Sequence, residues 1–214
     1  MEINRILQDP KYEKTLHELS LDVTHNIYVV ESNKKAIDFD CIVRDLSSLE
    51  GLKPKCILEN STLCCNDICS SNDALIRFGE NEFIFIEFKN RKINTDTKPN
   101  IKKKILCSNE ILKVLLKENN YFIKTNCSYI LVYTTIKNRG AAEREKNLNL
   151  SNHEIQDSNN KAFIAQHLIF KATYKYSIQF GLDEFISTLF KNAATICNET
   201  FDRLVADNFR GFMT

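Results

Sequence analysis

The chain has 214 residues, of which 43% are hydrophobic and 27% charged, and its formal net charge at pH 7 is +1. This is the balance of an ordinary globular protein, and the length fits a single domain over residues 1–214. The near-zero charge excludes a protein that binds nucleic acid through a uniformly basic surface, so any such binding must come from a local patch.

The sequence contains no segment typical of export or of a membrane span. Residues 1–14 are polar and charged and lack the apolar core of a signal peptide. The longest apolar runs, near residues 83–86 and 129–133, are too short to cross a bilayer. We therefore expect a cytoplasmic protein without membrane contact, whose eight cysteines are thiols. Four cysteines cluster without the paired spacing of a zinc site: Cys56, Cys64, Cys65 and Cys69.

Two helices are predicted in the N-terminal part of the chain. The first covers residues 10–20, where Asp9 can cap the helix and Pro10 suits its first position. The second covers residues 33–49, because its apolar residues recur every three or four positions. Residues 26–30 fit either a strand or part of a helical unit. Further on, residues 55–58 are a candidate strand and residues 59–71 a loop.

Residues 72–90 are predicted to form a β-hairpin. Two apolar runs, 73–78 and 82–88, flank a turn at residues 79–81. With this turn, the numbers of opposed residues sum to 160, so Asp73 faces Glu87. The Cβ atoms of opposed residues lie about 4.5–5.5 Å apart. Because side chains alternate along a strand, Lys89 lies on the same face as Glu87.

Two opposed carboxylates beside a lysine require a physical explanation, because like charges directly opposite each other destabilise a sheet. Mg²⁺ (or Mn²⁺) would remove the repulsion, since hard cations take carboxylate and carbonyl oxygens. Such a cation can activate water and neutralise the charge of a phosphodiester. Lys89 would then stabilise the anionic transition state. The simpler alternative is a surface ion pair between Lys89 and one of the carboxylates.

Asp73 followed by Glu87-Phe88-Lys89 resembles the motif of the PD-(D/E)XK nuclease superfamily, which has the restriction-endonuclease-like fold. The resemblance covers a core of about residues 34–135, with Asn72 where the name of the motif has proline. Two other short matches, at residues 9–11 and 96–98, neither end an apolar strand nor have a hairpin partner.

The resemblance implies a role for each residue of the motif. Asp73, Glu87 and the Phe88 carbonyl would bind the metal ion, and Asp73, Glu87 and Lys89 would be catalytic. In the superfamily a helix before the hairpin often supplies a further acidic ligand. Asp40 is the candidate for that ligand, and Glu50 is the second choice.

A helix is predicted over residues 101–118 and a strand over residues 128–136. The helix buries one face, made of Ile101, Ile105, Ser108, Leu112 and Leu115. Its first turn is basic, and a polar loop precedes it. Next to a phosphodiester site, the lysines of this region would bind the nucleic-acid backbone: Lys92, Lys102, Lys103 and Lys104.

The C-terminal extension, residues 136–214, is predicted to be largely helical. Helices are expected at residues 141–147, 161–173 and 183–206, with a strand at 174–180. The apolar stripe of the last helix could cover the sheet or form a homodimer face.

The resulting prediction is an α/β protein with a restriction-endonuclease-like core, a mixed central sheet and flanking helices. We expect a metal-dependent nuclease that hydrolyses phosphodiester bonds, in DNA rather than RNA. The alternative is a catalytically inactive nuclease-like protein that binds another protein as an immunity or regulatory partner.

Overall fold

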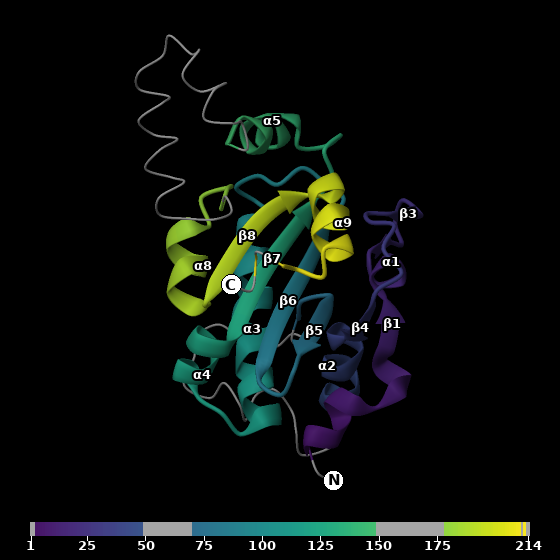
Figure 1. Ribbon diagram of the computed structural model, residues 1–214, viewed down its shortest axis with the longest axis vertical. Coiled ribbons are helices and arrows are strands. Elements are labelled where there is room, and N and C mark those ends of the chain that lie inside the picture. The colour runs from purple at the N-terminus through teal and green to yellow at the C-terminus, as the bar shows by residue number, and fades with distance from the viewer. Residues whose placement is uncertain (1–2, 49–69, 149–177, 211, 213–214) are drawn as a thin grey trace.

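The computed structural model describes residues 3–48, 70–148, 178–210 and 212. Within these ranges a six-stranded sheet has the order β1-β4-β5-β6-β7-β8, and β2 and β3 form a separate ribbon (Figure 1). The pairs from β1 to β6 are antiparallel, whereas β6, β7 and β8 are parallel. The strands are β1 (Glu13–Thr15), β2 (Leu21–Asp22), β3 (Ile27–Tyr28), β4 (Lys35–Asp38), β5 (Ala74–Phe78), β6 (Glu82–Lys89), β7 (Cys127–Tyr133) and β8 (Asn192–Cys197).

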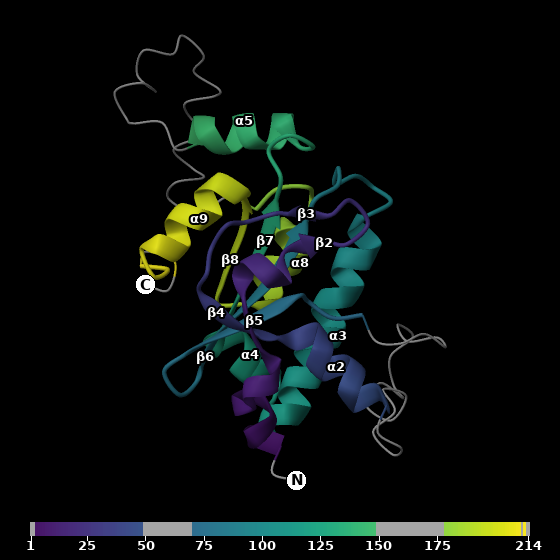
Figure 2. The same ribbon diagram turned by 90° about the vertical axis from the view of Figure 1, so that its right-hand side faces the viewer.

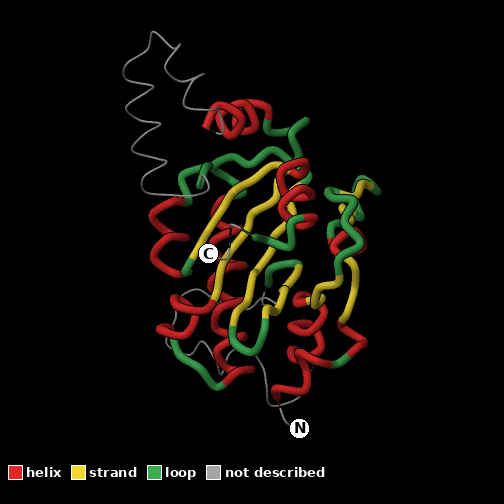
Figure 3. The backbone as a smooth tube through the Cα atoms, in the orientation of Figure 1, coloured by secondary structure: helices red, strands yellow, loops and turns green. Residues whose placement is uncertain are grey.

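Helices cover both faces of this sheet. Figure 2 shows α2 and α3 on one side and α9 on the other, and Figure 3 shows the strands between the helices. The α-helices among the described residues are α1 (Leu16–Leu19), α2 (Phe39–Ser48), α3 (Lys98–Leu116), α4 (Asn120–Asn126), α5 (Arg139–Leu148), α8 (Asp183–Leu189) and α9 (Asn198–Ala206). Two short 3-10 helices, Ile3–Gln8 and Pro10–Tyr12, precede β1. The predicted α/β class with a mixed central sheet is therefore confirmed.

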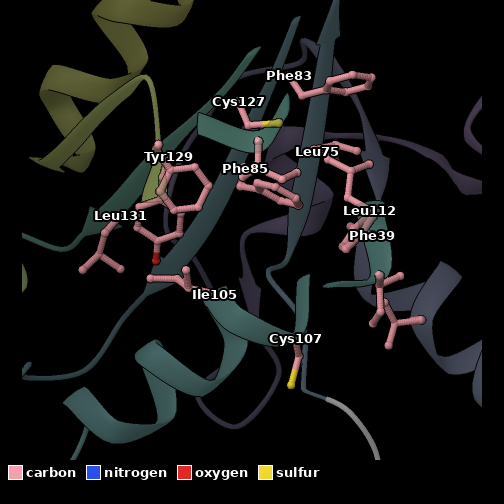
Figure 4. Close-up of a cluster of buried hydrophobic side chains, with 14 of the residues drawn as sticks. Phe39, Leu75, Phe83, Phe85, Ile105, Cys107, Leu112, Cys127, Tyr129 and Leu131 are labelled. Carbon is pink, nitrogen blue, oxygen red and sulfur yellow. The ribbon is translucent and has the colours of Figure 1, made fainter. Parts of the chain in front are cut away.

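The central strands are buried on both faces, which explains their nearly continuous apolar sequences. On the α3 side, Phe85 and Tyr129 pack with Ile105 in a cluster that Figure 4 shows in detail. On the α9 side, Ile84 and Ile130 belong to a second cluster with aromatic residues of the C-terminal segment: Phe201, Phe209 and Phe212. The part of the predicted apolar stripe that lies in α9 therefore covers the sheet.

The hairpin forms in the predicted register. Ala74 pairs with Ile86 and Phe78 with Glu82, so the numbers of opposed residues sum to 160. Gly79 in the turn has a φ of 56°, a conformation that glycine adopts without steric cost. β5 begins at Ala74, one residue after the predicted start, and Asp73 directly precedes it.

The two predicted N-terminal helices are partly wrong. Residues 10–20 contain a 3-10 turn that Asp9 caps, then β1, then α1. Residues 33–49 begin with β4, and α2 starts only at Phe39, where Asp38 accepts a hydrogen bond from Cys41 N at 2.8 Å. The physical reason is tertiary: β1 and β4 pair with each other, and the ladder outweighs helical periodicity.

The long helix predicted over residues 183–206 is also wrong in its middle. The segment forms α8, β8 and α9, and β8 pairs in parallel with β7. The extension therefore contributes a strand to the central sheet and is not purely helical. Residues 178–180 are not part of a strand, and the rest of the strand predicted at 174–180 lies outside the described residues.

The remaining predicted elements fall into two groups. Those over residues 101–118, 128–136 and 141–147 are confirmed as α3, β7 and α5, with bounds shifted by a few residues. Glu50, the strand at 55–58, the four clustered cysteines and the helix at 161–173 lie outside the described residues. Among the helices that the structure describes, none has the length and apolar character needed to cross a bilayer.

The packing of α3 on the sheet gives the first prediction. Leu112 is fully buried in the α3-side cluster, so Leu112→Ala should lower the free energy of unfolding by about 2–5 kcal/mol. Val114 on the same helix is 37% exposed, and Val114→Ala should cost clearly less. Denaturant unfolding of both variants measures the difference. Equal losses would mean that α3 does not bury the Leu112 face.

Candidate active site at the end of strand β6

Asp73 and Glu87 converge at the end of the hairpin, on the face of the sheet that α3 covers. The Phe88 backbone N–H donates to Asp73 Oδ2 at 2.7 Å, which fixes one side of that carboxylate. The Glu87 side chain is fully buried. Lys104 Nζ lies between the two carboxylates, 3.0 Å from Asp73 Oδ1 and 2.9 Å from Glu87 Oε1.

Lys89 lies on the same face and forms an ion pair with Glu87. Lys89 ends strand β6, and it is only 8% exposed. Asp73, Glu87 and Lys89 are thus brought together as predicted, in a more enclosed setting than expected. The interpretation as a surface ion pair does not describe this arrangement, because the Glu87 carboxylate is withdrawn from solvent.

Lys104 is predicted to bind a nucleic-acid backbone, and that role stays a prediction. In the structure its ammonium group bridges the two carboxylates. Four residues along α3, Ser108 Oγ accepts a hydrogen bond from Asn72 N at 2.8 Å. Residues four apart share a helix face, so one face of α3 holds both the Asn72 backbone and the Asp73 carboxylate.

The other lysines predicted to bind nucleic acid lie nearer the surface. Lys92 is exposed, and Lys102 and Lys103 are partly buried near the start of α3. Their role in binding a phosphate backbone stays a prediction.

The charges of the cluster change the pKa values of its members. Burial, followed by the charge of Glu87, raises the pKa of Asp73. Burial acts to lower the pKa of Lys104, but the Glu87 and Asp73 carboxylates outweigh it and the pKa is raised. Lys104 is therefore a fixed positive charge at neutral pH.

Asp40, the candidate for a further metal ligand, is bonded to residues outside the Asp73–Glu87 pair. It lies in the first turn of α2, where it accepts a hydrogen bond from Ser71 Oγ at 2.8 Å. Its carboxylate also lies 3.4 Å from Arg44 Nε. Among the described residues, no group of three or more His, Cys, Asp or Glu side chains could hold a metal ion. Asp40 thus does not complete a three-carboxylate cluster with Asp73 and Glu87.

The donor set nevertheless fits Mg²⁺ or Mn²⁺. Oxygens of Asp73 and Glu87 lie within 3.0 Å of one point, and a positive charge already stabilises them there. Mg²⁺ is commonly held by one or two carboxylates and keeps several of its waters. Binding at this point requires the Lys104 ammonium group to move away.

A cavity of about 350 Å³ is lined by Asp73, Phe88 and Lys89. The β2–β3 ribbon and the residues that follow Lys89 also line it, including Asp22, Thr24, His25, Asn90 and Arg91. These further lining residues were not predicted from the sequence. The available sequence signal was weak: Asn90 and Arg91 directly follow the motif, but nothing local places Asp22 and His25 near them.

A larger cavity, of about 1040 Å³, lies between α5, β8 and α9 and contains none of the predicted site residues. Its buried carboxylate, Glu145, accepts hydrogen bonds from Tyr133 Oη at 2.6 Å and Cys197 N at 2.8 Å. A buried acid with these donors is satisfied by the fold. We therefore place the candidate chemistry at the smaller cavity.

Comparison of the chain with protein-family models, with curated proteins and with solved structures finds no match. The resemblance to the nuclease superfamily accordingly rests on the motif residues and on their arrangement.

Removal of the Lys104 charge should convert the cluster into a better metal site. Lys104→Met leaves two close carboxylates with less compensation, so the metal-free protein should lose about 3–5 kcal/mol of stability, as when a buried pair is broken. Mg²⁺ or Mn²⁺ should restore more stability in this variant than in the wild type, because no ammonium group has to be displaced. A hundredfold excess over Kd adds about 2.7 kcal/mol.

Thermal unfolding with and without each metal measures this effect. Lys103→Met, one position away on the same helix, should respond to metal like the wild type. If Lys104→Met gains no more stability from metal than Lys103→Met does, the point between the carboxylates is not a metal site.

The raised pKa of Asp73 predicts a pH dependence of stability in metal-free buffer. An acid whose pKa is higher in the folded state stabilises the fold while it is protonated, below its unfolded value of about 3.9. That stabilisation is lost as the pH rises through the folded value. The wild type should therefore lose stability relative to Asp73→Asn as the pH rises above about 4.

Denaturant unfolding between pH 4 and pH 7 tests the sign of this effect. The variant Asp96→Asn, which removes an exposed carboxylate away from the cluster, is the control. A constant difference between wild type and Asp73→Asn would show that Asp73 has no raised pKa.

Proposed function

We propose that this protein is a metal-dependent nuclease with a restriction-endonuclease-like core. The observation that carries the proposal is the convergence of Asp73, Glu87 and Lys89 on one face at the end of β6, beside a cavity. The order of the β5–β6 hairpin, α3 and the parallel strand β7 also agrees with the core that the resemblance implies. The proposed substrate is a phosphodiester bond, in DNA rather than RNA.

Each residue of the cluster would have a distinct role. Asp73 and Glu87, with the Phe88 carbonyl, would hold Mg²⁺ or Mn²⁺, which supplies Lewis-acid activation of water and neutralises phosphate charge. Lys89 would stabilise the charge that develops on the phosphate oxygens, and it is already held in place by Glu87. The Phe88 N–H orients Asp73, so the carboxylate keeps its direction without a ligand.

Lys104 would compensate the two carboxylates until metal and substrate bind. Its long side chain can then turn toward the substrate phosphates, which would preserve part of the role predicted for the basic first turn of α3. The Lys104 side chain would therefore neutralise the carboxylates before substrate binds and contact the nucleic-acid phosphates afterwards.

A second function is favoured by one observation, the ammonium group of Lys104 between the carboxylates. A cluster whose charges are compensated within the chain needs no metal for its stability. This arrangement supports a catalytically inactive nuclease-like protein that acts as an immunity or regulatory partner of another protein.

Nuclease assays separate the two functions. The purified protein would be incubated with plasmid, single-stranded DNA and RNA in Mg²⁺ or Mn²⁺, and in chelator. Metal-dependent cleavage supports the nuclease, whereas the absence of cleavage of all three substrates favours the inactive protein.

Loss of the Lys89 charge should affect cleavage more than binding. Lys89→Ala should lower the cleavage rate by about 10²–10³, because one preorganised charge-stabilising group is lost. Some stability should also be lost, since Lys89 is buried, but Glu87 keeps Lys104 as a partner. Single-turnover rates and DNA affinity would be measured well below the melting temperature of the variant.

Lys92→Ala is the matched control, because Lys92 is exposed. It should alter DNA affinity at most and leave the single-turnover rate near that of the wild type. A wild type that cleaves DNA and a folded Lys89→Ala variant that cleaves it equally fast would refute the assignment of Lys89.

A further inference from the structure

The β2–β3 ribbon holds a histidine at the cavity beside Lys89. The ribbon pairs Leu21 with Tyr28 and Asp22 with Ile27, and its turn includes Asn26 with a φ of 53°. Asp22 Oδ1 accepts a hydrogen bond from Thr24 N at 3.0 Å. These features bend the turn so that His25 lines the cavity that Asp73 and Lys89 also line.

The ring of His25 is oriented by a carboxylate. His25 Nδ1 lies 2.9 Å from Asp22 Oδ2, and because a carboxylate only accepts hydrogen bonds, Nδ1 is the donor. The second ring nitrogen, Nε2, is then available to a ligand. A carboxylate that fixes the tautomer of a histidine in this way is a common feature of acid–base catalysis.

Asp22 also connects this pair to the strand that carries the motif. Asn90 Nδ2 donates to Asp22 Oδ2 at 3.0 Å, and Asn90 directly follows Lys89. The histidine–aspartate pair is therefore attached to the end of β6 and does not depend on the ribbon alone for its position. The side chain of His25 is 57% exposed, so a substrate in the cavity can reach it.

We infer that His25 is the general acid of the proposed nuclease reaction, and that Asp22 is its positioning residue. This inference rests on the proposed function. The oxygen of a water molecule bonds to phosphorus, and the bond between phosphorus and the leaving bridging oxygen breaks. The electron pair of that bond goes to the leaving oxygen, which takes a proton from His25 Nε2. The attacking water loses its proton to solvent, from which the imidazole is reprotonated.

The charged groups that line the same cavity are Asp22, Asp73, Lys89 and Arg91. Lys89 and Arg91 are the cations of this lining that would hold a phosphate in the cavity. Because His25 lines the same cavity as Asp73 and Lys89, it would protonate the leaving group of a phosphodiester bound there.

Replacement of the leaving oxygen by sulfur tests the inference, because a thiolate leaves without a proton. The products of the wild type first identify which bridging oxygen leaves. An oligonucleotide with the normal oxygen and one with sulfur at that position would then be cleaved by wild type and His25→Ala in Mn²⁺. His25→Ala should cleave the oxygen substrate about 10²–10⁴ times more slowly, the usual contribution of a general acid.

With the sulfur substrate, His25→Ala should cleave at nearly the wild-type rate. Added imidazole should also restore part of the cleavage of the oxygen substrate. The matched control is His17→Gln, since His17 stacks on Tyr28 and does not line the cavity. This variant should behave like the wild type on both substrates.

The outcomes distinguish the two proposals. If wild type cleaves and His25→Ala cleaves the oxygen substrate as fast, His25 is not the general acid and the nuclease assignment stands. If His25→Ala loses the same factor on both substrates, the histidine binds or supports the site, and the inference is again overturned. If the wild type cleaves neither substrate, the proposed function fails and the inference fails with it.

Discussion

The pairing of β5 with β6 determines which charged side chains meet in the candidate site. A register that sums to 160 places Asp73 opposite Glu87, and a shift by one residue would move the paired side chains to opposite faces. Two carboxylates on one enclosed face repel each other, so the fold must bring positive charge to them. The chain does so twice, with Lys89 from the same strand and Lys104 from α3.

This requirement links the site to the packing of α3. The helix is held against the sheet by the apolar residues of one stripe, and Lys104 and Ser108 lie on the side that meets residues 72 and 73. The hydrophobic cluster therefore sets the position of the ammonium group. A substitution that shifted α3 would disturb the electrostatics of the site without touching any charged residue.

The motif and its hairpin were predictable because the signals are local. Two apolar runs and one glycine turn fix the strands, and the spacing then fixes which side chains oppose each other. β8 was not predictable in this way, since Ala193 and Ile196 fit helical spacing as well as a strand. Its structure comes from parallel pairing with β7, more than 50 residues away in the chain.

The same distinction between local and tertiary signals applies within the site. Glu87 and Lys89 are two residues apart on one strand, so their common face follows from alternation. Lys104 belongs to α3 and His25 to the turn of the β2–β3 ribbon. Their contacts therefore depend on how these two elements pack against the sheet. From the sequence alone, a lysine in a basic run is expected to be solvated. The packing of α3 on the sheet places Lys104 beside two carboxylates. Lys104, which balances the charge of the carboxylates, and His25, which lines the neighbouring cavity, are thus residues that the motif does not include.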